Sequence, residues 1–249
     1  MGAHIRPEMT RKTLFLASPV RSGSTYIAEE IAYRLQRYGE FEFFDLTRDA
    51  FEGLTDSSTA AEIKEIYRKL FKDPRSGWST TKIHCAGLSI ITREARRDPE
   101  LREAFFGANS RWIIVQRRNK IAQAVSLATA RKSDVWHVYG DPESAGDQDV
   151  KVGVSEIQEA LRAILFDDVY LDALSGMLAP ERVIRVTYED VFGGARKTAA
   201  AVAKLCELDV KLGKERHKQV AKIVPSARSA KSSLVEEFTN WLAENYHQV

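Results

Sequence analysis

The stretch LFLASPVRSGSTYIAEEIAYRL, residues 14–35, decides the fold of this 249-residue chain. It begins as a short apolar run, breaks at the small polar turn SPVRSGST, and continues with Ile27, Ile31 and Leu35 at helical spacing. A turn of this kind leaves backbone N–H groups unpaired at the start of the helix, where they and the helix dipole favour an anion. The sequence therefore predicts a strand–turn–helix unit that binds an anion, with phosphate as the default ligand.

Outward from this unit, short apolar runs alternate with longer helical patterns. Further strands are predicted at 78–84, 111–116 and 182–188, and helices at 59–72, 87–97, 119–132, 154–176, 195–207 and 232–246. Strands separated by helices imply crossover connections, so we predict an α/β fold with three layers, α/β/α, around a central parallel sheet. Ligands of such sheets bind beyond the carboxyl ends of the strands. Two segments, 45–57 and 133–153, fit neither pattern.

Length and composition favour a single domain over residues 1–249, with residues 1–12 as a disordered tail. The chain has 37 Lys+Arg against 35 Asp+Glu, so its formal charge of +2 gives no general attraction to nucleic acid. No apolar run approaches the roughly 20 residues that span a bilayer, and the first residues lack the hydrophobic part of a secretion signal. We therefore expect a cytoplasmic protein. The two cysteines suggest neither a disulfide framework nor a zinc site.

The turn differs from the Walker pattern G-x-x-x-x-G-K-[ST] at its most important position. Gly23 stands at the second glycine and Thr25 at the hydroxyl, but Ser24 stands at the lysine. Because the Walker lysine reaches the β and γ phosphates, its absence disfavours a nucleoside triphosphatase. Arg21 supplies the positive charge instead, beside the hydroxyl of Ser22. Such residues also occur at turns simply as helix caps, so a second site is needed to support the interpretation.

That second site lies in IIVQRRNKIAQAVSLATARKSDVWHV, residues 113–138. A strand ends there in the adjacent Arg117 and Arg118, and the helix that follows carries Ser126. An arginine at the end of a strand can reach back over the first turns of the next helix. The arginines and the serine together could therefore hold a second phosphate.

The two sites together resemble the nucleotide-binding elements of the sulfotransferases, which use 3′-phosphoadenosine-5′-phosphosulfate (PAPS). More narrowly, QAVSLATARKSDVWH is similar to the trehalose sulfotransferase-like (Stf0-type) branch, and VTYEDV, residues 186–191, resembles the Tyr-Glu-Asp motif of the superfamily. The resemblance implies the P-loop-like sulfotransferase fold, PAPS as the donor and no metal. It also implies the donor-binding residues: Arg21, Ser22, Gly23, Ser24 and Thr25 for the 5′-phosphosulfate, and Arg118 with Ser126 for the 3′-phosphate.

A C-terminal basic loop usually closes over the nucleotide in these families. The matching stretch is VPSARSAKSS, residues 224–233, in which we choose Arg228. The alternative is a solvated basic linker before the last helix.

Two residues compete for the role of the base that removes the acceptor proton. Glu42 in EFEFFD resembles the segment where Stf0-type enzymes place their proposed base, whereas His84 in TTKIHC resembles the Lys-x-His segment of the cytosolic sulfotransferases. We favour Glu42, keep His84 as a second base or as a donor that orients the acceptor, and note that Glu40 replaces Glu42 if the alignment slips. By the same resemblance, Lys82 polarises the bridging oxygen of the donor.

Trp136 and His137 stand at the start of the long segment 133–153. An aromatic and a polar ring at a cleft suit stacking against a sugar or closing over the nucleotide. The alternative is that Trp136 only anchors the loop to the core.

We therefore expect a sulfotransferase that acts on a hydroxyl of a small glycan, glycolipid or related metabolite. The acceptor class rests on the family resemblance alone, and Stf0-type relatives also suggest a homodimer. The first alternative is a nucleotide kinase with an altered loop, which the missing lysine disfavours. The second is a nucleotide-binding protein without catalysis, which the presence of Arg21, Arg118 and Ser126 disfavours.

Overall fold

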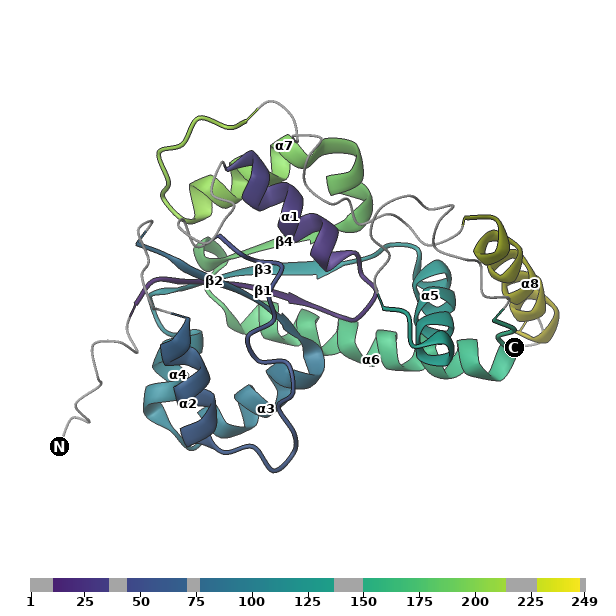
Figure 1. Ribbon diagram of the computed structural model, residues 1–249, viewed down its shortest axis with the longest axis horizontal. Helices are drawn as coiled ribbons and strands as arrows, with labels where there is room; N and C mark the ends of the chain where they lie inside the picture. Colours follow the sequence, from purple (N-terminus) through teal and green to yellow (C-terminus); the bar gives the residue numbers. More distant parts are fainter. Residues whose placement is uncertain (1–10, 36–43, 71–76, 137–149, 214–227, 247–249) are drawn as a thin grey trace.

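The computed structural model describes residues 11–35, 44–70, 77–136, 150–213 and 228–246 (Figure 1). Its four strands form one sheet in the order β2-β1-β3-β4, and every neighbouring pair is parallel. The strands are β1 (Thr13–Ser18), β2 (Ser79–His84), β3 (Ser110–Gln116) and β4 (Val183–Thr187). Because parallel strands run in one direction, each must be joined to the next by a crossover, and helices supply these crossovers.

Helices lie in two layers on the sheet and in a group at its end. They are α1 (Ser24–Arg34), α2 (Ala60–Lys69), α3 (Cys85–Ala95), α4 (Pro99–Phe106), α5 (Lys120–Ser133), α6 (Val154–Met177), α7 (Tyr188–Leu205) and α8 (Arg228–Tyr246). Helices α1 and α7 cover one face, whereas α2, α3, α4 and α6 cover the other (Figure 1). The predicted three-layer α/β/α architecture around a parallel sheet is therefore confirmed.

Strand β1 builds the core on both faces of the sheet. Leu14 and Leu16 pack with α1 and α7, whereas Phe15 and Ala17 pack with the helices of the opposite face, as the alternation of a strand requires. All four side chains are fully buried. This central strand therefore fixes the turn that follows it against both layers.

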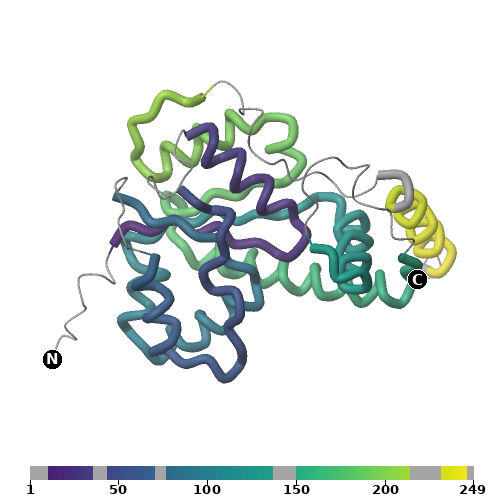
Figure 2. Tube along the Cα trace, in the orientation of Figure 1, coloured from purple at the N-terminus to yellow at the C-terminus, as the bar shows by residue number. Residues whose placement is uncertain are grey.

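A third apolar cluster joins α5, α6 and α8 beyond the end of the sheet. Phe238 of α8 is fully buried in it, among residues of α5 such as Val125. Figure 2 shows the C-terminal helix, in yellow, beside α5 although the two are far apart in sequence. The sheet end is thereby flanked by helices that come from three parts of the chain.

The two largest differences between the observed elements and the sequence-based expectations concern helices. Helix α4 was not anticipated, and α7 begins at Tyr188 rather than at 195. The early start of α7 has a local cause, because the Thr187 hydroxyl accepts a hydrogen bond from the backbone N–H of Asp190 at 3.2 Å and so caps the helix. The expected tail lies, up to residue 10, outside the described residues.

Candidate active site

The carboxyl ends of the four parallel strands meet at one edge of the sheet. Ser18, His84, Gln116 and Thr187 are the last residues of β1, β2, β3 and β4, and a helix begins shortly after each of them. This edge therefore gathers the turn after β1, His84 at the end of β2 and the paired arginines after β3.

The turn between β1 and α1 has an unusual backbone. Arg21 and Gly23 both have positive φ, of 58° and 79°. Gly23 precedes the first residue of α1, and a Cβ at this position would lie 2.3 Å from Cδ2 of Tyr188. Only glycine therefore suits both the backbone and the close approach of the ring. The turn presents the start of α1, where backbone N–H groups favour an anion.

Arg21 connects this turn with the second predicted site. Its Nε donates a hydrogen bond to Oγ of Ser126 at 3.0 Å, and a terminal nitrogen donates to the backbone carbonyl of Trp136. Burial is the main cause that lowers the pKa of Arg21, and the charge of Arg117 lowers it further. The structure thus joins Arg21 to Ser126, which was predicted at the second phosphate beside Arg118, and to Trp136.

Lys82 approaches the turn from the neighbouring strand β2. It is only 5% exposed, and its Nζ donates a hydrogen bond to Oγ1 of Thr25 at 3.1 Å. Burial lowers the pKa of this lysine, whereas the negative charge of Asp49 is the largest influence in the opposite direction. Lys82 therefore brings a positive charge to the start of α1. It does so from strand β2, whereas the Walker lysine belongs to the turn itself.

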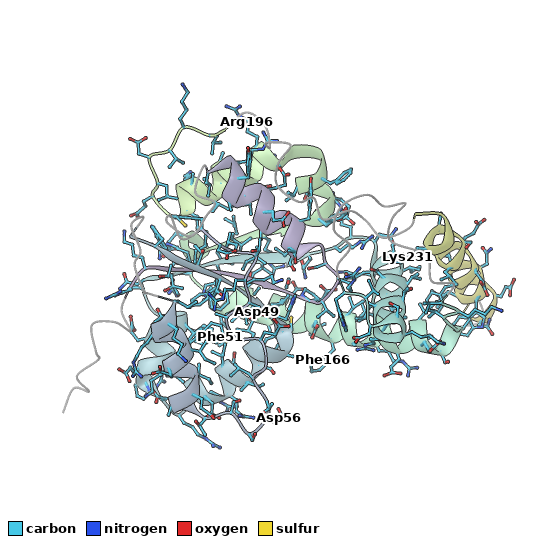
Figure 3. The ribbon with its side chains drawn as sticks, viewed as in Figure 1. Asp49, Phe51, Asp56, Phe166, Arg196 and Lys231 are labelled. Carbon is cyan, nitrogen blue, oxygen red and sulfur yellow. The ribbon has the colours of Figure 1, made fainter. Side chains whose placement is uncertain are left out.

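His84 ends strand β2 beside the first strand. Its Nδ1 lies 3.4 Å from both Oγ and the carbonyl oxygen of Ser18. Its backbone N–H donates to Oδ2 of Asp49 at 3.2 Å, so segment 45–57 is tied to the end of β2. Figure 3 marks Asp49 and the buried Phe51 in this segment. The imidazole is half-buried at the edge where the predicted donor site lies.

The two adjacent arginines after β3 have different surroundings. Arg118 is exposed, and its Nη2 forms an ion pair with Oδ1 of Asp190 at 2.7 Å. Arg117 is half-buried, with its guanidinium 5.3 Å from the ring centre of Tyr188. Arg118 is thus directed to α7 rather than to Ser126, whose hydroxyl is bound by Arg21.

Two polar groups at the turn are buried without a hydrogen-bond partner among the described residues. They are Oγ of Ser22 and Oε1 of Gln123. The amide nitrogen of Gln123 donates to the carbonyl of Val20 at 2.9 Å, so α5 holds the turn in place. Ser22 was expected in the site, whereas Gln123 was not singled out, although it stands in the quoted run QAVSL.

Some of the expected site residues lie outside the described part. Glu40, Glu42 and His137 belong to the segments that the structure does not describe. Arg228 is the first residue of α8, but its side chain is likewise not described. These four assignments stay predictions, as do the roles of the other site residues.

The described residues hold neither a cluster of metal-ligand side chains nor a membrane-spanning helix. No three His, Cys, Asp or Glu side chains in the described ranges gather closely enough to hold a metal ion. Within the same ranges, no helix has the length and apolar character needed to cross a membrane.

Comparison with solved structures finds sulfotransferases of low sequence identity. One is a sulfotransferase domain from the curacin biosynthetic pathway, 16% identical, with 81% of this chain and 75% of that chain covered and a TM-score of 0.45. A second is a sulfotransferase from Alicyclobacillus acidocaldarius, 13% identical, with 94% and 92% covered and a TM-score of 0.49. A third is retinol dehydratase in complex with androsterone and the inactive cofactor PAP, 12% identical, with 98% and 83% covered and a TM-score of 0.49.

Comparison of the sequence itself gives the family. No curated protein matches it significantly. The model of the Stf0 sulphotransferase family matches residues 89–232, which is more than half of the chain and includes β3, the paired arginines and α5. The chain therefore belongs to the Stf0 sulphotransferase family.

Proposed function

We propose that this protein transfers a sulfuryl group from PAPS to a hydroxyl of a small glycan, glycolipid or related metabolite. Membership of the family supports sulfuryl transfer. The acceptor class rests on the resemblance of residues 123–137 to the trehalose sulfotransferase-like branch. We further propose a homodimer on the same basis and, from the sequence features given above, a cytoplasmic location.

The observation that carries this proposal is the chemistry of the turn after β1. Arg21 donates only to neutral oxygens in the described structure, and the buried hydroxyl of Ser22 has no partner there. A half-buried guanidinium without a carboxylate is costly unless an anion accompanies it. The turn thus fits a phosphate-type group, and the missing Walker lysine argues against a nucleoside triphosphate.

The residues that would hold the donor lie on β2 and in the segments that follow β1 and β3. Arg21, Gly23, Ser24 and Thr25 would bind the 5′-phosphosulfate, while Lys82 stands beside Thr25 for the bridging oxygen. In this proposal Arg118 turns from Asp190 to the 3′-phosphate, and Arg21 releases Ser126 for the same group. The bound donor supplies the sulfuryl group, and the protein aligns it and stabilises charge on the departing phosphate.

The acceptor side needs a base and a binding surface. Glu42 would take the acceptor proton, with His84 as the alternative base or as the group that orients the acceptor. His84 lies beside Ser18, at the end of the strand that leads into the turn, which is a suitable place for either role. Trp136 and His137 would contact the acceptor, and Trp136 is 40% exposed, so its ring is accessible. Arg228 would close over the nucleotide.

The test is calorimetric titration of the purified protein with PAP, the product nucleotide, and separately with ADP and Mg-ATP. We expect PAP to bind most tightly and Arg118→Ala to remove the preference for the 3′-phosphate. Removal of Mg²⁺ should leave sulfuryl transfer unchanged, whereas a kinase would lose its activity. A preference for Mg-ATP, or no binding of PAP, would refute the proposal.

A further inference from the structure

Arg117 points to the face of the sheet that α1 and α7 cover. Along β3, Ile113 and Val115 pack with these two helices, and Arg117 continues the same alternating series. Its guanidinium lies 5.3 Å from the ring centre of Tyr188, on α7. Arg117 is therefore on the same side of the sheet as the turn after β1.

The ring of Tyr188 links Arg117 to that turn. A Cβ at Gly23 would lie 2.3 Å from this ring, so the tyrosine packs directly against the last residue of the turn. Arg117, Tyr188 and Gly23 thus form a continuous series of contacts at the start of α1. The neighbouring Arg118 is excluded from this series because it is exposed and paired with Asp190.

Arg117 is half-buried and forms no ion pair among the described residues. Its Nε is buried with no hydrogen-bond partner there. Burial is the main cause that lowers the pKa of Arg117, although the negative charge of Glu189 opposes this effect. The carboxylate of Glu189 accepts its hydrogen bonds from the backbone N–H groups of Arg118 and Asn119.

A second guanidinium stands close by. The charge of Arg117 lowers the pKa of Arg21, so the two cations are near enough to repel each other. In the described structure no carboxylate forms an ion pair with either of them. Two half-buried like charges are costly in the free protein and become favourable when an anion lies between them.

We propose that Arg117 is a donor-binding residue that, together with Arg21, holds the 5′-phosphosulfate. This inference rests on the proposed function and moves Arg117, which the sequence placed beside Arg118 at the second phosphate, to the 5′-phosphosulfate. When the bond between sulfur and the bridging oxygen breaks, its electron pair stays on the 5′-phosphate, and Arg117 stabilises that charge. The new bond forms between sulfur and the acceptor oxygen, whose proton passes to Glu42 or His84.

The test compares Arg117→Met with Arg118→Ala in titrations with PAP, adenosine 5′-monophosphate and adenosine 3′-monophosphate. Because charge-assisted hydrogen bonds are lost, Arg117→Met should lower the affinity for PAP and for the 5′-monophosphate by roughly 10- to 100-fold. The affinity for the 3′-monophosphate should stay unchanged. Arg118→Ala should lower the affinity for PAP and for the 3′-monophosphate only. Arg111→Ala is the matched control, because Arg111 lies near the start of β3, where it donates to the carbonyl of Leu205.

A second measurement separates binding from a structural role. Arg117→Met should raise the melting temperature of the free protein, because it removes a half-buried charge that has no ion pair among the described residues and whose Nε has no hydrogen-bond partner there. If Arg117 only supported Tyr188, the same change would lower the melting temperature. A lowered melting temperature, or unchanged affinity for PAP and the 5′-monophosphate, overturns the inference. So does a weakening limited to the 3′-monophosphate.

The outcomes for the wild-type protein keep the two proposals apart. A protein that binds PAP no better than the 5′-monophosphate contradicts the proposed function, while the titration with the 5′-monophosphate still decides the role of Arg117. A protein that binds neither nucleotide overturns both.

Discussion

Gly23 is a position at which a side chain would meet both backbone strain and a steric clash. Its φ of 79° is costly for any side chain, and a Cβ would lie 2.3 Å from Cδ2 of Tyr188. Gly53 has a similar φ, of 90°, but a Cβ there would meet nothing within 4 Å. Both glycines thus need a positive φ, but only Gly23 lacks the space for a Cβ.

We predict that Gly23→Ala lowers the free energy of unfolding by roughly 2–4 kcal/mol, from backbone strain and the displaced ring together. Gly53→Ala, as the control, should cost only about 1–2 kcal/mol, because only the backbone is strained. Urea denaturation of both variants measures the difference. Equal losses in the two variants would mean that Tyr188 does not press on the turn.

At the scale of elements, helix α5 holds the turn after β1 through one side chain. Gln123 is fully buried, and its amide nitrogen donates to the carbonyl of Val20 at 2.9 Å. Gln116 makes comparable bonds at the end of β3, to Asp168 and Asp172 of α6 at 3.3 and 3.2 Å. The first contact concerns the donor site, whereas the second joins β3 to a helix of the opposite layer.

We predict that Gln123→Met weakens PAP binding by roughly tenfold, since the carbonyl of Val20 loses its partner and the turn loses its position. Gln116→Met should lower the free energy of unfolding by about 1–2 kcal/mol and leave the affinity for PAP unchanged. Calorimetry and thermal denaturation of both variants give the comparison. Equal PAP affinities would show that α5 does not position the turn.

The elements also show how far the sequence can be interpreted. Strand β1 matches the apolar run that the sequence places before the turn, because its six consecutive residues are buried between two helical layers. Helix α4 was missed although Asp98 and Pro99 form a helix start, since Oδ1 of Asp98 accepts from the N–H of Leu101 at 3.0 Å. Its eight residues are too few for a clear helical period.

The site was predicted as a set of residues but not as a set of contacts. Arg21 and Ser126 are 105 positions apart, and Lys82 and Thr25 are 57 apart, so only the strand order β2-β1-β3 brings them together. The choice between Arg117 and Arg118 depends on which face of the sheet each one follows. That face is set by the packing of Ile113 and Val115 with α1 and α7, which the sequence does not specify.

At the scale of the whole molecule, α6 presents an apolar stripe to solvent. Leu165, Val169 and Met177 follow one another at multiples of four residues and are 46%, 68% and 83% exposed, and Phe166 beside them is 75% exposed. Figure 3 marks Phe166 on this helix. Large apolar side chains that gather in this way on a single helix are typical of a surface that another helix covers. We infer that this stripe is covered by a second copy of the chain, in the homodimer suggested by the family. The two α6 helices would lie antiparallel, because a stripe on a two-fold axis packs against the same stripe of the other copy.

We predict that the wild-type protein is a dimer in solution and that Phe166→Glu combined with Val169→Glu makes it a monomer. A two-fold contact places each substitution in the interface twice, so four charges would have to be desolvated, and the dimer dissociation constant should rise by at least roughly 100-fold. Phe192→Glu is the control, because Phe192 is also an exposed aromatic residue, 57% accessible, but lies on α7 across the sheet from α6. Light scattering after size-exclusion chromatography measures the mass of all three proteins. A monomeric wild type would refute the assignment of this stripe, and so would a double variant that stays dimeric while the control dissociates. If the double variant is a monomer and still binds PAP, the donor site is complete within one chain.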